Sequence, residues 1–237
     1  MHTRARRRLP WLSLVFAVSL GLPGFSNASE WQQTGAQHAE FARALGDDGI
    51  RFDPKLLEWM SDFTDGDGDC PGKPAAKNLP ERERQRVELF RSKYCRPWNQ
   101  AWRVCDSGRP PSWCGAPSTV AGEFEKYFDT LSTALNGTRG ALQRYNIMAV
   151  VIAATGVHAI TEFPADRVDQ WVARSVSEFL RTATPGDAIQ IVGLLHLTWF
   201  GPGPTTTRHL KAYVASRPMS EEERRLLNAA LNRSHAN

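Results

Sequence analysis

The sequence predicts an all-α protein, either a helical bundle or a stack of helix hairpins. Over most of the chain, apolar residues recur at the three- and four-residue spacing of one helix face. Proline, glycine and capping residues interrupt these stretches where helices should begin or end. No alternation of polar and apolar residues runs for more than a few positions, so no strand is predicted.

Three segments are predicted along the 237 residues. Residues 1–28 have the features of a secretory signal peptide, with a basic head at Arg4–Arg8 and an apolar run at Trp11–Leu22. That run is shorter than the roughly 20 residues that span a bilayer, so we expect cleavage and no stable membrane span. Residues 29–117 are predicted to form a helical, loop-rich subdomain braced by disulfides, and residues 118–237 a compact all-helical domain.

The charge balance excludes two classes of partner. The chain has 29 Lys and Arg against 25 Asp and Glu, but four of the arginines lie in the predicted signal peptide, which has no acidic residue. Without that segment, basic and acidic side chains are equal in number. A neutral chain is a poor ligand for nucleic acid phosphates or an anionic membrane, so we predict neither as its partner.

The N-terminal part of the mature chain is predicted to contain three helices. Thr34 followed by Gln37 has the spacing of a capping box and predicts a helix start. Asp53 and Pro54, a capping residue followed by a first-turn proline, predict the next start. Pro80–Arg96 is predicted to form the third helix. Its inward-facing residues would be Val87, Phe90 and Tyr94.

The strongest helical patterns lie in the C-terminal half of the chain. Residues 118–137 place five apolar side chains on one helix face, and residues 141–160 are apolar on nearly every side, as expected of a central helix. Further helix starts are indicated, in order, by Pro164, by Thr184 with Pro185, by the turn at Gly201–Pro204, and by the capping box of Ser220 and Glu223.

The cysteines indicate an oxidising compartment. An even number of them falls in one short window, which favours two disulfides in an exported protein. No C-x-x-C pair is present to favour zinc instead. The four residues are Cys70, Cys95, Cys105 and Cys114. Three pairings remain open, of which we favour Cys70–Cys95 with Cys105–Cys114, and we expect a periplasmic or secreted protein.

An alternation of Asp and Gly is the most distinctive motif. Asp65, Asp67 and Asp69 have the spacing of the first acidic ligands in an EF-hand, where glycine permits the tight backbone of a calcium loop. The later glycine and glutamate of that motif are replaced by Cys70 and Ala76. Only a looser calcium site is therefore predicted, and calcium is the one cofactor that the sequence suggests.

Two other interpretations of the same acids remain open. The acids could form a solvated turn with no ligand. Alternatively, the acid-rich stretch Asp47–Asp69 could face the neighbouring basic stretch Glu81–Arg96 and have a structural role.

One pair of residues has the spacing of a catalytic or metal site. His158 and Glu162 are four residues apart and would share a helix face. In an apolar pocket beside Phe163, Glu162 would have a raised pKa, which suits a general acid for glycan cleavage. A metal site would need a third ligand such as His196 or His209. The alternative is that His158 is a hydrogen-bonded core histidine and Glu162 an ordinary helix-terminal charge. His196 lies in an apolar run and is expected to donate to a backbone carbonyl.

These observations favour a binding protein over an enzyme, because no strong catalytic motif is present. We expect an exported helical protein that binds another protein, such as an inhibitor or immunity-type protein against an envelope-acting enzyme. Asp65, Asp67 and Asp69 would meet a basic cleft on the partner, and Trp113 is the best candidate for an exposed aromatic anchor. A glycan hydrolase using Glu162 and a calcium-dependent structural module are the alternatives.

Overall fold

The computed structural model describes residues 30–52, 80–94, 117–155, 163–197 and 201–232. These residues form eight helices and no strand, which confirms the all-α class. In chain order the helices are α1 (Glu30–Asp47), α3 (Glu81–Lys93), α5 (Pro117–Gly137), α6 (Ala141–Ala154), α7 (Ala165–Leu180), α8 (Pro185–Leu195), α9 (Pro204–Ser216) and α10 (Glu221–Leu231). Within these ranges, no helix is both long enough and apolar enough to cross a membrane.

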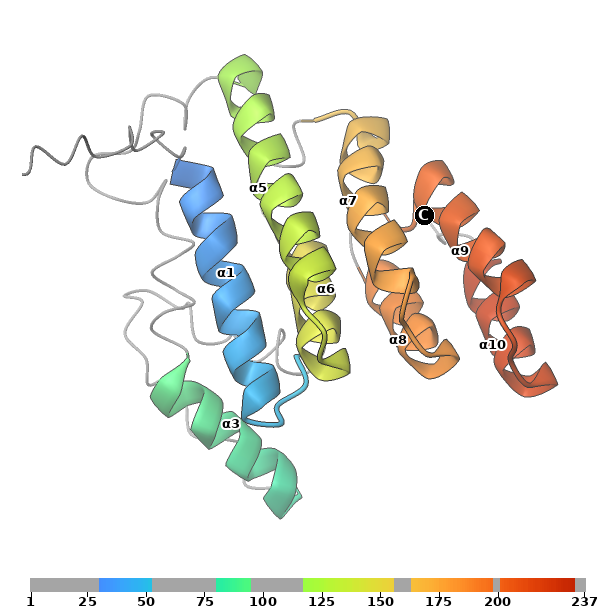
Figure 1. Ribbon diagram of the computed structural model, residues 1–237, viewed down its shortest axis with the longest axis horizontal. Helices are drawn as coiled ribbons and strands as arrows, with labels where there is room; N and C mark the ends of the chain where they lie inside the picture. Colours follow the sequence, from blue (N-terminus) through green and yellow to red (C-terminus); the bar gives the residue numbers. More distant parts are fainter. Residues whose placement is uncertain (1–29, 53–79, 95–116, 156–162, 198–200, 233–237) are drawn as a thin grey trace, which may run out of the picture.

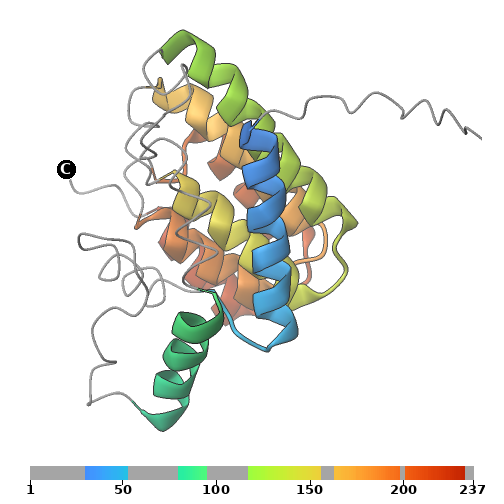
Figure 2. The ribbon, with the colours of Figure 1, turned by 90° about the vertical axis from the view of Figure 1, so that its left-hand side faces the viewer.

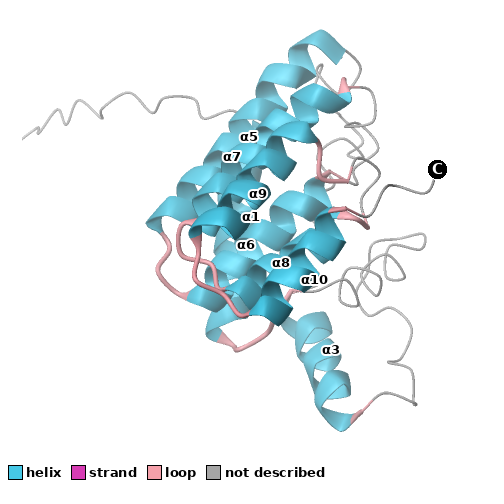
Figure 3. Cartoon of the chain, turned by 90° about the vertical axis from the view of Figure 1, so that its right-hand side faces the viewer, coloured by secondary structure: helices cyan, strands magenta, loops and turns pink. Residues whose placement is uncertain are grey.

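The helices are arranged in two layers (Figure 1). Helices α1, α5, α7 and α9 lie side by side in one layer, and α6, α8 and α10 lie behind them in the other. The pairs α5–α6, α7–α8 and α9–α10 each contribute one helix to each layer. The described residues therefore form a stack of three hairpins, with α1 at one end (Figure 2) and α9 and α10 at the other (Figure 3).

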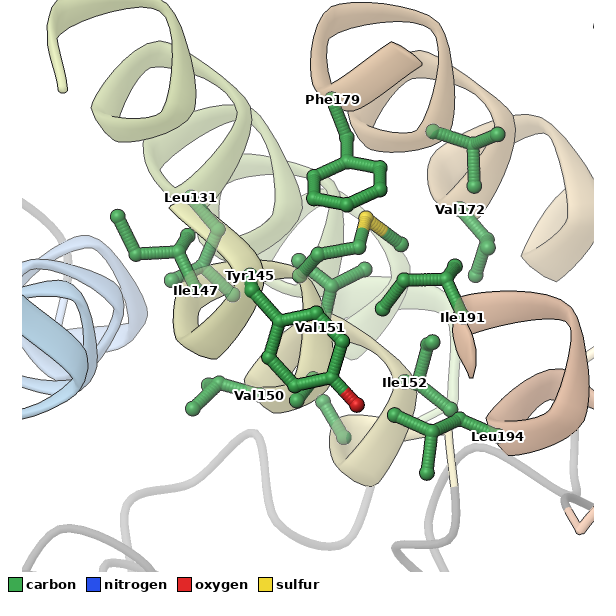
Figure 4. Packing of buried hydrophobic residues seen from close by; sticks show 14 of the residues in the cluster. Leu131, Tyr145, Ile147, Val150, Val151, Ile152, Val172, Phe179, Ile191 and Leu194 are labelled. Atoms are coloured by element: carbon green, nitrogen blue, oxygen red, sulfur yellow. The ribbon is translucent and has the colours of Figure 1, made fainter. Parts of the chain in front are cut away.

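Helix α6 is the centre of the core. It contacts α1, α5, α7 and α8, and every side chain from Arg144 to Ile152 is buried. Figure 4 shows Val151 and Ile152 of α6 packed among side chains from α7 and α8, including Val172 and Ile191. The predicted helix that is apolar on nearly every side is confirmed for the part that the structure describes.

Aromatic rings join the first-layer helices. The ring of Trp171 on α7 stacks on Phe124 and Phe128 of α5, with centroids 6.4 and 5.5 Å apart. Phe163, just before α7, meets Trp171 edge-on at 5.6 Å. The five residues predicted to form the inner face of α5 are all buried: Phe124, Tyr127, Phe128, Leu131 and Leu135.

The predicted start of the first helix is wrong. Helix α1 begins at Glu30, a full turn earlier, and Thr34 is a buried residue inside it rather than a cap. Tertiary packing explains the longer helix, because Trp31 lies against Phe124 of α5 with ring centroids 4.4 Å apart. After the helix, Gly49 turns the chain with φ of +71°, a left-handed conformation that favours glycine.

The predicted caps of the last two hairpins are confirmed. The Thr184 hydroxyl accepts a hydrogen bond from the N–H of Asp187 at 3.1 Å and begins α8. Before α10, the Ser220 hydroxyl accepts from the N–H of Glu223 at 3.2 Å, and the Glu223 carboxylate accepts from the N–H of Ser220 at 2.8 Å. Both bonds of the capping box are therefore present.

We expect Ser220→Ala to lower the free energy of unfolding by about 1 kcal/mol, because both the cap and its glutamate partner are lost. Urea denaturation followed by circular dichroism measures the change. Thr133→Ala, at an exposed position within α5, is the control and should not lower stability, because alanine favours a helix interior more than threonine does. If Ser220→Ala proved as stable as this control, the capping box would contribute nothing.

Candidate functional site

The predicted site residues fall outside the described ranges, so their roles remain predictions. The same holds for the signal peptide, the helix predicted from Asp53, the disulfides and the calcium site. The residues concerned are His158, Glu162, Asp65, Asp67, Asp69, Trp113, Cys70, Cys95, Cys105 and Cys114. The described residues nevertheless define how the chain is held where it enters one of these segments, residues 53–79.

Asn146 holds the backbone that immediately precedes residues 53–79. This asparagine on α6 is completely buried, and its side-chain oxygen accepts a hydrogen bond from the N–H of Phe52 at 2.7 Å. Its amide group donates to the carbonyls of Ile50 at 2.8 Å and of Ala42 at 3.2 Å. We call Ile50–Phe52 the anchor segment, because one side chain fixes its backbone at both ends.

Side chains from three other elements converge on Arg51 in the middle of the anchor segment. Its guanidinium lies 4.1 Å from the ring centroid of Tyr145 on α6 and donates to Asp187 of α8 at 3.2 Å. It also donates to Gln190, and its carbonyl accepts from Arg86 of α3. About a third of the Arg51 side chain is exposed, so this cluster reaches the surface, whereas Asn146 is completely buried.

Helix α3 is attached to the end of α1 that precedes the anchor segment. Phe90 meets Phe41 edge-on at 6.0 Å, and Lys93 pairs with the Asp48 carboxylate at 2.6 Å. Hydrogen bonds from Lys93 and then Tyr94 lower the pKa of Asp48. Asp48 belongs to the acid-rich stretch Asp47–Asp69 and Lys93 to the basic stretch Glu81–Arg96. This one ion pair therefore holds the two stretches together at the end of α1.

Elsewhere in the described residues, buried charged side chains form hydrogen bonds with backbone groups at the ends of helices. Arg144 donates to the carbonyls of Thr138 at 3.2 Å and Glu178 at 2.5 Å, near the C-terminal ends of α5 and α7. The carboxylate of Asp169 accepts from the N–H groups of Thr205 at 2.6 Å and Thr206 at 3.1 Å, at the N-terminus of α9. Each charge lies at the end of a helix that favours its sign, so both are explained by the fold.

The histidines considered as additional ligands do not form a metal site with described residues. The Nε2 atom of His196 lies 2.6 Å from the carbonyl of Ala230, which confirms the predicted bond to the backbone, although the side chain is only half-buried. Nowhere in the described ranges do three or more His, Cys, Asp or Glu side chains form a group that could hold a metal ion.

No protein family, curated protein or solved structure matches the chain. The candidate site is therefore interpreted from its own residues. Sequence reasoning missed Asn146 and Arg51, which hold the anchor segment. The available signal was the carboxamide of Asn146 next to a long apolar run, since a buried polar group needs hydrogen-bond partners.

Proposed function

We propose that this chain is an exported helical protein that binds another protein through the segment Asp62–Asp69, called the acidic stretch from here on, with Asp65, Asp67 and Asp69 as contact residues. The observation that supports the proposal is the anchor segment. A completely buried Asn146 and the partly exposed cluster around Arg51 hold the backbone of Ile50–Phe52, and the acidic stretch follows later in the chain.

A firmly held base favours binding because association costs conformational entropy. Each side chain or loop that must become ordered in the complex weakens affinity, and a rigid scaffold reduces that cost. The stacked hairpins supply such a scaffold: Phe52 is completely buried, and α6, which clamps it, is surrounded by four other helices.

The negative charge of the acidic stretch indicates what kind of partner it would bind. Three aspartates within five residues complement a basic cleft, and such complementarity accelerates association and excludes partners with acidic surfaces. An inhibitor or immunity-type protein acting on an enzyme with a basic substrate cleft fits this description. Trp113 is the proposed aromatic contact in the same interface.

The proposal is tested by capture of a partner from the native envelope fraction on immobilised residues 29–237. We expect a stoichiometric protein on the wild-type chain and at least a tenfold loss with Asp65→Asn, Asp67→Asn and Asp69→Asn combined. The matched control combines Glu40→Gln, Glu88→Gln and Glu221→Gln, which removes the same charge from exposed positions on α1, α3 and α10. The control should bind like wild type.

The other outcomes contradict the proposal in different ways. Equal capture by wild type and the aspartate variant removes the acidic stretch from the interface. Release of peptidoglycan fragments by the purified chain, abolished by Glu162→Gln without a change in Tm, would favour the glycan hydrolase. A rise in Tm with calcium, lost in the aspartate variant, would favour the calcium-dependent module.

A further inference from the structure

The arrangement of the helices limits which of the cysteines can pair. The sequence leaves three pairings open, and the cysteines themselves lie outside the described residues. Two of them nevertheless adjoin the ends of described helices. Cys95 directly follows Tyr94, which caps the C-terminal end of α3. Cys114 is three residues before Pro117, where α5 begins. The positions of these two helix ends can therefore be compared with the reach of the chain.

Helix α5 begins at the N-terminal end of α1, because the two helices run side by side in the same direction. The rings of Trp31 and Phe124 are 4.4 Å apart. One turn further along both helices, a Cβ atom at Gly35 would lie 3.1 Å from the carbonyl oxygen of Tyr127. The first two turns of α5 precede Phe124, so they project beyond the N-terminal end of α1 (Figure 1).

Helix α3 ends near the opposite end of α1. The hydroxyl of Tyr94 donates to the carbonyl of Ala44 at 3.1 Å and also to the carboxylate of Asp48. The Tyr94 ring meets Phe41 edge-on, with centroids 5.5 Å apart. Figures 1 and 2 both show α3 level with the last turns of α1 or beyond them. Ala44 and Pro117 lie roughly 20 helical positions apart along the shared direction of α1 and α5, which is about 30 Å.

This separation exceeds what the chain can span. One peptide unit places the Cα atom of Cys95 about 4 Å from that of Tyr94. Three extended residues place Cys114 at most about 11 Å from Pro117. A disulfide adds a distance of at most about 7 Å between its two Cα atoms. These lengths total about 22 Å against a separation of about 30 Å, so Cys95 and Cys114 cannot bond while α3 and α5 hold their places.

The other two cysteines are within reach of Cys95. Cys105 is ten residues further along the chain, a span of up to about 35 Å when extended. Cys70 is ten residues before Pro80 and can reach equally far from it. The intervening helix α3 has 13 residues and is therefore only about 20 Å long. The described helices thus permit a bond from Cys95 to either residue.

We propose that Cys95 forms a disulfide with Cys70 or Cys105, and that the pairing of Cys95 with Cys114 is excluded in the folded chain. Each disulfide forms when two thiols lose two protons and two electrons to a disulfide-exchange oxidant of the exporting compartment, whose own disulfide is reduced to a dithiol. The inference follows from the positions of α1, α3 and α5 and does not depend on the proposed partner. Its failure would leave the proposed function untouched.

Disulfide mapping of the mature chain, purified from the compartment to which it is exported, tests the proposal. Free thiols are blocked with a maleimide, and the protein is digested without reduction at about pH 6, where few thiols are ionised and exchange is slow. Trypsin separates Cys95 from Cys105 at Arg103, and a protease that cleaves before aspartate separates Cys105 from Cys114 at Asp106. We expect the peptide that contains Cys95 to be linked to a peptide other than that of Cys114. A link to Cys114, or maleimide on Cys95, would overturn the proposal.

A two-cysteine variant makes the test specific. Cys70→Ser combined with Cys105→Ser leaves Cys95 and Cys114 as the only thiols. With oxidised glutathione as the oxidant, we expect no bridge between them in the folded variant at neutral pH. In concentrated urea, which unfolds the helices, the same two thiols should bridge, because closing a short flexible loop is then unhindered. Equal bridging in both solvents would overturn the proposal. Should circular dichroism show that the variant does not fold, the disulfide map of the wild-type chain decides.

Discussion

Replacing Asn146 with alanine is expected to lower the free energy of unfolding by about 3–5 kcal/mol, because three hydrogen bonds are lost and buried backbone groups lose their partner. The N–H of Phe52 and the carbonyl of Ile50 are bonded to this side chain within the core. Urea denaturation of the purified variant measures the change. The same substitution should weaken partner capture, because it releases the anchor segment.

The control for this prediction is Asn228→Ala. Asn228 is an exposed residue of α10, so its replacement should change stability by no more than about 0.5 kcal/mol. A loss below about 1 kcal/mol for Asn146→Ala would contradict the role of the clamp. Its unfolding curve would then resemble that of the control.

Trp171→Ala is expected to lower stability by about 3–5 kcal/mol, the usual cost of deleting a fully buried aromatic side chain. Trp171 is 2% exposed, and its ring contacts Phe128, Phe124 and Phe163. Its removal would leave a cavity between α5 and α7. Thermal and urea denaturation, compared at the same pH, measure the loss.

Trp171→Phe is the matched variant for this prediction. It keeps an aromatic ring against Phe128 and leaves a smaller cavity, so we expect less than half the loss of the alanine variant. Similar losses for both variants would indicate that a phenyl ring cannot replace the indole in this packing. A negligible loss for alanine would contradict the packing of α5 on α7.

The helices of residues 117–232 could be predicted from local patterns. The apolar spacing in α5 identified its buried face, and the caps at Thr184 and Ser220 identified two helix starts within one residue. These signals are local because a helix face and a cap depend on residues three or four positions apart. The start of α1 was missed for the opposite reason, since the contact of Trp31 with Phe124 joins distant parts of the chain.

The anchor segment could not be predicted because its partners are distant in sequence. Asn146 bonds to residues about one hundred positions away, and Arg51 to side chains of α6 and α8. Helical periodicity identifies which residues are buried but not which helices meet. A polar side chain beside an apolar run, such as Asn146, indicates that a partner exists and leaves its identity open.

A hydrogen-exchange footprint of the captured partner on the mature chain tests the central claim most directly. Exchange is measured with and without the partner, at neutral pH. We predict protection in peptides that contain Asp65, Asp67 and Asp69 and in peptides that contain the anchor segment, with no change in α9. Protection confined to α9 or α10, with the acidic stretch unaffected, would contradict the account.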